Sequence, residues 1–214
     1  MSWGFHFKGT IIKLVNFFID GFNVFHSLED HPEYHKYKWL NYSKLAKCFL
    51  PPKTTLNKIY YFTAFATWKP SKVLKHKTYI KALRHVGVDV VHGKFKKKDK
   101  YCPNCEKYFK TPEEKKTDVN IAIRLFQDAV NDEYDIAIII SGDSDLIPSV
   151  EAIKSTFPSK EIGIVIPIKR HALELKNVSD FHMKMKEKHL ASSVFDDIIT
   201  LDNGQTLTKP ASWI

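Results

Sequence analysis

The second half of the chain alternates apolar runs with amphipathic stretches. Residues 135–140 and 161–166 are apolar runs rich in β-branched side chains, and both end abruptly. Residues 118–130 and 146–157 instead carry apolar side chains three or four positions apart. This pattern predicts helix, strand, helix and strand in that order, which is typical of a parallel sheet with helices on both faces.

The first half repeats this alternation. Apolar or aromatic runs at residues 14–19, 58–64 and 88–91 predict three more strands, and residues 41–50 and 71–86 predict helices. The crossovers between parallel strands are expected to be right-handed. We therefore expect an α/β fold with a central, mostly parallel sheet of about five strands.

Residues 93–112 interrupt the alternation, because they are polar, basic and aromatic without a helical pattern. A connection of roughly 20 residues without a helix is unusual in a compact domain, so we expect an extended hairpin or a functional loop. After residue 180 the pattern weakens. We expect one domain over residues 1–190, which contains this basic, cysteine-bearing loop, and a C-terminal tail over residues 191–214.

The composition favours a polyanionic partner. The chain carries 33 Lys and Arg against 24 Asp and Glu, a net charge of +9. Such an excess is typical of proteins that bind nucleic acid, although a solvated basic surface gives the same count. No apolar run approaches the roughly 20 residues of a membrane-spanning helix, and the N-terminus lacks a secretory pattern. Three cysteines are too few for a disulfide framework, so we expect a cytoplasmic protein.

Acidic residues follow the predicted strands. Asp20 comes directly after the first strand, Asp143 and Asp145 follow the fourth, and Asp118 begins a helix. Because ligands of an open parallel sheet bind beyond the carboxyl ends of its strands, these acids are expected at one edge, and Asn23 lies about one helical turn after Asp20. Taken singly, a turn would explain Asp20 and a helix N-terminus would explain Asp118. Together the four carboxylates favour a metal site.

Clustered carboxylates repel one another unless a cation neutralises them. Mg²⁺ and Mn²⁺ prefer oxygen ligands. Such an ion lowers the pKa of a bound water and stabilises charge on a phosphoryl oxygen, so hydrolysis of a phosphodiester is the expected chemistry. A phosphatase with an aspartate nucleophile would need a second acid two residues later, and Phe22 occupies that position after Asp20.

Three motifs, at residues 17–23, 114–119 and 140–148, resemble the NYN domain in its LabA-like branch, and the resemblance covers residues 14–182. NYN domains belong to the PIN-like nuclease superfamily. The resemblance therefore implies a Rossmann-like, three-layer α/β/α fold and an endoribonuclease that depends on Mg²⁺ or Mn²⁺. It implies metal ligands at Asp20, Asp118, Asp143 and Asp145, with Asn23 and Ser141 as polar neighbours in the catalytic site.

The resemblance also implies that an activated water attacks phosphorus directly, while Ser141 holds a ligand or the phosphate. Two other functions stay open. One is a non-catalytic RNA-binding or regulatory module that keeps the acids as a scaffold. The other is a nuclease that acts on single-stranded DNA.

Lysines and aromatic residues mix in the basic loop, which suits a single RNA strand through phosphate contacts and base stacking. A solvated charge run has the same composition. Position favours the RNA interpretation, because the loop leads into the helix that begins near Asp118 and so overhangs the acidic edge. The expected RNA-binding residues are Lys94, Lys96, Lys97, Lys98, Lys115, Lys116 and Arg170.

Cys102 and Cys105 have the spacing of half a zinc site. No second such pair exists in the sequence, so a structural Zn²⁺ would need His92, another histidine, or ligands from a second chain in a homodimer. The simpler interpretation, which we favour, is a tight turn at a hairpin tip with two reduced thiols.

Overall fold

The computed structural model describes residues 12–213. Its centre is a six-stranded sheet in the order β3-β2-β1-β6-β7-β8, and every neighbouring pair is parallel. The strands are β1 (Lys13–Asp20), β2 (Thr54–Thr63), β3 (Asp89–His92), β6 (Ile136–Ile140), β7 (Glu161–Ile166) and β8 (Phe181–Lys184). The predicted α/β/α fold class is confirmed, and the sheet has one more strand than expected.

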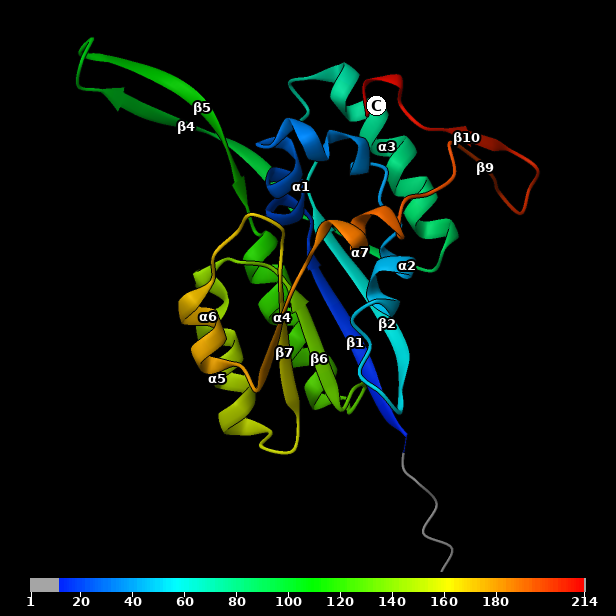
Figure 1. Cartoon of the computed structure of the whole chain (residues 1–214). Coiled ribbons are helices and arrows are strands. Elements are labelled where there is room, and N and C mark those ends of the chain that lie inside the picture. Colours follow the sequence, from blue (N-terminus) through cyan, green and yellow to red (C-terminus); the bar gives the residue numbers. More distant parts are fainter. Residues whose placement is uncertain (1–11, 214) are drawn as a thin grey trace, which may run out of the picture.

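Helices cover both faces of this sheet (Figure 1). One face packs against α1 (Gly21–Glu29), α2 (Tyr42–Lys47), α3 (Pro70–His85) and α7 (Glu187–Ala191). The other face packs against α4 (Thr117–Val130), α5 (Ile147–Thr156) and α6 (Leu173–Val178).

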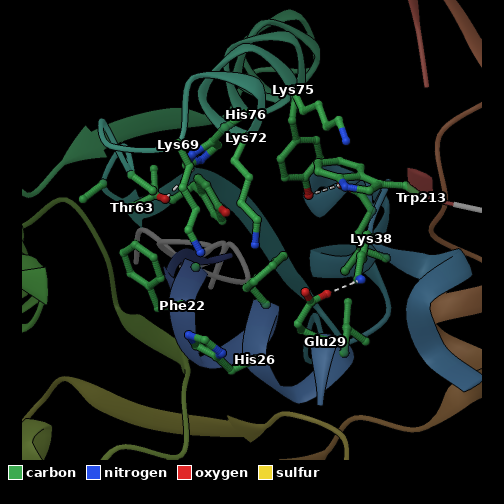
Figure 2. Close-up of a pocket in the computed structure, with 18 of the residues that line it drawn as sticks. Phe22, His26, Glu29, Lys38, Thr63, Lys69, Lys72, Lys75, His76 and Trp213 are labelled. Carbon is green, nitrogen blue, oxygen red and sulfur yellow. Dashed lines mark hydrogen bonds and ion pairs between the residues drawn. The ribbon is translucent and has the colours of Figure 1, made fainter. Parts of the chain in front are cut away.

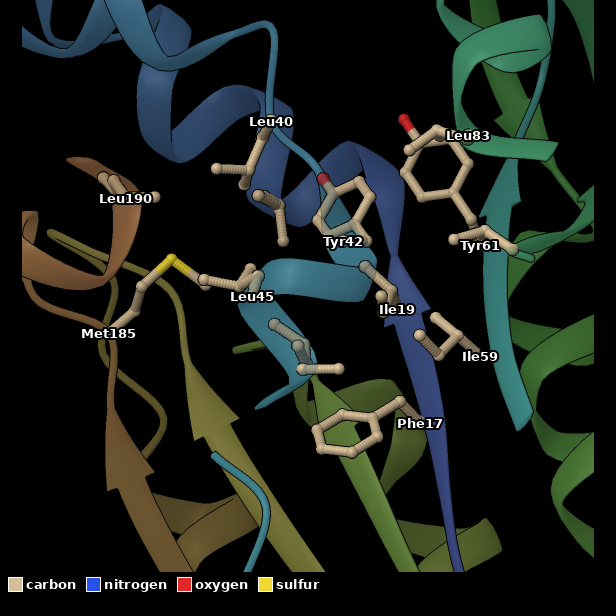
Figure 3. Packing of buried hydrophobic residues seen from close by; sticks show 14 of the residues in the cluster. Phe17, Ile19, Leu40, Tyr42, Leu45, Ile59, Tyr61, Leu83, Met185 and Leu190 are labelled. Carbon is tan, nitrogen blue, oxygen red and sulfur yellow. The ribbon is translucent and has the colours of Figure 1, made fainter. Parts of the chain in front are cut away.

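Strand β1 supplies side chains to both layers, because alternate residues of a strand point to opposite faces. Phe17 and Ile19 lie in the layer with α2 and α3, whereas Phe18 lies in the layer with α4. Figure 3 shows Phe17 and Ile19 among Tyr42, Leu45 and other apolar side chains. The strand is buried from Val15 to Asp20, so its carboxyl end is rigidly placed.

Strand β8 and helix α1 were not among the elements predicted from the sequence. Strand β8 lies at the sheet edge and alternates half-buried and exposed residues, so it lacks the apolar run of a buried strand. Helix α1 begins at Gly21, directly after β1, where we predict no helix from the sequence, although we expect Asn23 about one helical turn after Asp20. Asp20 caps this helix, because its Oδ1 accepts the Asn23 N–H at 3.0 Å.

The basic loop is an extended hairpin, one of the two forms expected for it. Strands β4 (Lys94–Cys102) and β5 (Lys107–Lys115) pair antiparallel along their whole length. Figure 1 shows this hairpin, which we call the arm, projecting from the body near α1. At the base of the arm, the Phe95 ring packs edge-on against the rings of Phe22 and Trp68, with centroids 5.5 and 4.7 Å away.

The segment after α7 packs against the layer that contains α3. The Phe195 N–H donates to the Trp39 carbonyl at 3.0 Å, and Phe195 and Leu207 are buried in the same hydrophobic cluster as Trp39. A small antiparallel pair, β9 (Ile198–Thr200) and β10 (Thr206–Thr208), completes the segment. The short helices are η1 (Pro32–Tyr37), η2 (Ser144–Leu146) and η3 (Ala211–Trp213). Within residues 12–213, every helix is too short or too polar to cross a membrane.

Candidate metal centre

Three aspartates from separate segments meet at the carboxyl end of the sheet. Asp20 ends β1, Asp143 follows the adjacent strand β6, and Asp118 lies in the first turn of α4. One carboxylate oxygen from each lies within 4.8 Å of the others. The strand order reverses between β1 and β6, and ligands of such sheets bind at this reversal.

Asp20 is buried and held by two protein donors. The Ser141 hydroxyl donates to its Oδ2 at 2.8 Å, and the Asn23 N–H donates to its Oδ1. Burial raises the pKa of Asp20, and the nearby charge of Asp143 raises it further, although these hydrogen bonds oppose the shift. The carboxylate is thus fixed in orientation but costly to ionise without a counter-charge.

Asn23 and Ser141 fasten the loop after β6 to the end of β1. The Gly142 N–H donates to Asn23 Oδ1 at 3.0 Å, and the Asp143 N–H donates to Ser141 Oγ at 3.0 Å. Both predicted polar residues therefore lie at the site. Their hydrogen bonds position the aspartates and the Gly142 backbone.

Asp118 is half-buried, and its pKa is raised to about 6. Burial is the main cause, followed by the negative charges of Asp20, Asp143 and Glu114. Glu114 was not among the predicted site residues. Its Oε1 accepts hydrogen bonds from both the backbone and the hydroxyl of Thr117, so it orders the start of α4. Glu114 is the first residue of the motif at residues 114–119, which is the sequence signal that points to it.

Asp145 lies beside this group but outside it. Its side chain is exposed, and its backbone N–H donates to Asp143 Oδ1 at 3.0 Å. Its negative charge raises the pKa of Asp118 less than the charges of Asp20 and Asp143 do. The closest cluster therefore contains three of the four predicted metal ligands.

The predicted RNA-binding lysines divide between the arm and its base. Lys94, Lys96, Lys97 and Lys98 are exposed along β4. At the base of the arm, Lys115 pairs with Glu113 at 2.9 Å, and Lys98 approaches the same carboxylate at 3.6 Å. Lys116 is exposed and directly precedes α4, with a left-handed φ of 82°.

Arg170 lies next to the acidic loop rather than on the arm. Its Cβ would be 3.4 Å from a Cβ built on Gly142, so the two backbones are close neighbours. Its guanidinium pairs with Asp30 at 3.0 Å. Part of its charge is therefore balanced by the end of α1.

Cys102 is the last residue of β4, and Cys105 lies in the turn that follows, so both are at the tip of the arm. Hydrogen bonds from the backbone and thiol of Cys105, and from the backbone of Asn104, lower the pKa of Cys102. His92 precedes the base of β4, roughly 30 Å away along an extended strand. Within residues 12–213, the aspartate cluster is the one group of three or more metal-ligand side chains, and neither cysteine belongs to it.

The model of the NYN domain family matches residues 15–185 of the chain. A 55-residue stretch is 34% identical to 6-hydroxy-3-succinoylpyridine 3-monooxygenase of Pseudomonas putida, and it spans 26% of this chain and 17% of that protein. The fold is similar to that of a Vibrio parahaemolyticus protein of unknown function, with a TM-score of 0.61 and 15% identity over 88% of this chain and 99% of that one. Because the family model spans both the sheet and all three aspartates, the chain belongs to the NYN domain family.

Proposed function

We propose that this protein is a metal-dependent endoribonuclease that hydrolyses RNA phosphodiester bonds with Mg²⁺ or Mn²⁺. The observation that carries the proposal is that carboxylate oxygens of Asp20, Asp118 and Asp143 lie within 4.8 Å of one another. Membership of the NYN domain family supports nuclease chemistry at this site. A lone aspartate at a strand end would carry no such weight.

The donor set fits a hard divalent cation. All three ligands are carboxylate oxygens, which Mg²⁺ and Mn²⁺ prefer over nitrogen or sulfur. The raised pKa values of Asp20 and Asp118 reflect burial and mutual repulsion, and a cation would relieve the repulsion. The cluster is therefore arranged at a free-energy cost that a bound ion would offset.

Each residue has a distinct role in the proposed reaction. A bound Mg²⁺ or Mn²⁺ would supply an activated water and charge stabilisation at the phosphoryl group. Asp20, Asp118 and Asp143 would hold the ion, and Ser141 and Asn23 would keep the carboxylates and the Gly142 backbone in place. We assign the exposed Asp145 to the rim, where it would bind water or a second cation.

The arm favours RNA in single-stranded form as the substrate. Tyr101, Tyr108 and Phe109 are 51%, 76% and 50% exposed among the arm lysines, an arrangement that suits base stacking combined with phosphate contacts. The cytoplasmic location and the homodimer stay predictions from the sequence.

Cleavage assays with Asp143→Asn test the enzyme. We expect cleavage of single-stranded RNA in Mg²⁺ or Mn²⁺ to fall by about a hundredfold or more, since even the neighbours of metal ligands cost about 10–100-fold when lost. Asp202→Asn makes the same change at a side chain that is 97% exposed and lies outside the metal centre, so it serves as the control.

Two outcomes would replace this proposal. If the wild-type chain and Asp143→Asn both bind RNA equally and neither cleaves it, the protein is a non-catalytic RNA-binding module. If a matched single-stranded DNA is cleaved in preference to RNA, the substrate assignment is wrong and the metal chemistry stands.

A further inference from the structure

A cavity of about 520 Å³ opens beside the metal centre, between α1, α3 and the base of the arm. Its size lies within the range of about 300–1,000 Å³ that is usual for small-molecule sites. Figure 2 shows side chains from α1 on one side of the cavity and from α3 on the other. None of its lining residues belongs to the aspartate cluster.

The cavity and the metal centre meet at the carboxyl end of β1. Gly21 and Phe22 line the cavity, and they directly follow the cluster residue Asp20. Tyr61 also lines it; burial raises the pKa of this tyrosine, a hydrogen bond with Thr63 opposes the shift, and the charge of nearby Asp20 adds to it. An RNA strand bound across the aspartates can therefore place the adjoining nucleotide in the cavity.

Aromatic and aliphatic side chains form much of the lining. Phe22 and Trp68 pack edge-on against Phe95 at the base of the arm. Leu28, Leu40 and Ala64 contribute further apolar surface. Such a surface suits the flat face of a nucleobase, since all four bases can stack on aromatic rings.

The polar groups in the cavity suit the other parts of a nucleotide. In Figure 2 the side chains of Lys69, which directly precedes α3, and of Lys72 in α3 extend toward Phe22 and His26. No ion pair within residues 12–213 involves either lysine. Lys38 forms an ion pair with Glu29 at the opposite end. Burial opposes ionisation of Glu29, but the hydrogen bond and charge of Lys38 lower its pKa, so it stays an anionic acceptor.

We propose that this cavity binds one unpaired nucleotide of the substrate strand. The base would stack against the surface that Phe22, Trp68 and Phe95 form, the ammonium groups of Lys69 and Lys72 would contact its phosphates, and Glu29 would accept from base N–H groups. The placement next to the scissile bond rests on the proposed nuclease function. A paired base stays stacked in its duplex, so the site accepts unpaired nucleotides and excludes duplex RNA.

The test measures binding by fluorescence anisotropy in the full chain carrying Asp143→Asn, so that the strand is not consumed. The probes are a labelled oligouridine and a labelled blunt RNA duplex. Trp68→Ala and Lys72→Ala should each weaken oligouridine binding by about tenfold. Trp68→Ala should leave duplex binding unchanged.

Lys81→Ala is the matched control for Lys72→Ala. It removes the same charge from α3, at an exposed position nine residues later and therefore on the opposite side of the helix. It should change oligouridine binding by less than about twofold. Lys72 is also exposed, so its variant keeps the test valid if Trp68→Ala disturbs the base of the arm.

Three results would overturn the proposal. In the first, neither Trp68→Ala nor Lys72→Ala weakens oligouridine binding. In the second, Trp68→Ala weakens oligouridine and duplex equally. In the third, free uridine monophosphate binds more tightly than oligouridine, which would make the cavity a site for free nucleotides. If the unmodified chain cleaves no RNA but the Trp68 effect appears, the nuclease proposal fails and the nucleotide site stands.

Discussion

At the scale of single residues, the metal centre places function and stability in opposition. Asp118 is ionised above a pKa of about 6, whereas an unfolded aspartate ionises near 3.8. The folded state therefore binds the proton more tightly, so stability falls as pH rises through this window and stays reduced above it. Without a cation, this carboxylate destabilises the fold at neutral pH.

Asp118→Asn should consequently stabilise the metal-free protein near pH 7.5. We expect a gain of roughly 1 kcal/mol in the free energy of unfolding, after allowance for solvent screening of a half-buried group. Near pH 4 the advantage should shrink, because the wild-type carboxyl is then largely protonated. Urea denaturation in EDTA at both pH values measures the difference. Equal stability of the two proteins at neutral pH would show that the ionised Asp118 carboxylate does not destabilise the folded state.

Gly21 lies between Asp20 and the cavity, where no side chain fits. A Cβ at this position would be 2.6 Å from the Phe62 carbonyl oxygen and 2.6 Å from the Tyr61 ring. Gly21→Ala should therefore lower the free energy of unfolding by about 1–3 kcal/mol, as expected for overpacking. Thermal or urea denaturation measures it.

Gly142→Ala is the control for Gly21→Ala, because it also follows a central strand at this edge. Its added Cβ would meet its nearest neighbours at 3.4 Å, close to ordinary contact distance. We expect a change below about 1 kcal/mol. A similar cost for both variants would contradict the explanation by close packing.

At the scale of elements, the arm is an appendage whose strands pair with each other and with no strand of the central sheet. Lys96 and Glu113 are paired across the two strands. Residues 97–112 can therefore be replaced by an Asn-Gly turn, which suits a two-residue hairpin. Phe95 is retained, so the unfolding free energy should change by less than about 1 kcal/mol.

RNA binding by this shortened protein should lose much of its salt dependence. The deletion removes Lys97, Lys98, Lys100, Lys107 and Lys110. Since each phosphate contact adds about 0.7 to the slope of log affinity against log salt for single strands, we expect the slope to fall by about 1–3. Anisotropy at several KCl concentrations measures it. An unchanged slope and affinity would show that the arm does not hold the strand.

A double variant, Tyr101→Ala with Tyr108→Ala, separates stacking from charge on the arm. These rings lie 5.2 Å apart near the tip, and every lysine is kept. Affinity should fall while the salt slope stays constant.

At the scale of the whole molecule, the sequence predicts best where burial is continuous. Strands β1, β6 and β7 appear as mainly apolar runs because both of their faces are covered, and the ends of β1 and β6 locate Asp20 and Asp143. Asp118 was predictable from its helix and motif. The edge strand β8 was missed because one in two of its residues is exposed.

Features assembled from distant segments were not predictable in this way. The cavity joins α1, the loop before α3, the base of the arm and Trp213, and none of these segments shares a local pattern with another. Likewise, residues 193–213 are polar on average, yet Phe195 and Trp213 pack against aromatic residues more than 100 positions earlier, and Leu207 is buried in the same cluster. Single apolar residues in a polar segment carry no periodicity that would reveal their partners.

Truncation after Ser192 tests whether this last segment is part of the folding unit. It removes buried Phe195, the bridge between Leu40 and Val194, and the hydrogen bond from Trp39 Nε1 to the Asp196 carbonyl. Since loss of one buried Phe alone costs about 3–5 kcal/mol, the truncated chain should be at least about 3 kcal/mol less stable in urea.

Ile198→Ala in the full chain is the control, because Ile198 belongs to the same segment but is 63% exposed. We expect it to cost less than about 1 kcal/mol. If the truncated chain unfolds at the same urea concentration as the full chain, residues 193–213 are a tail that the domain does not need. If it is destabilised as expected, the folding unit extends beyond the residues matched by the family model, because Trp39 in the core would otherwise lose its covering layer.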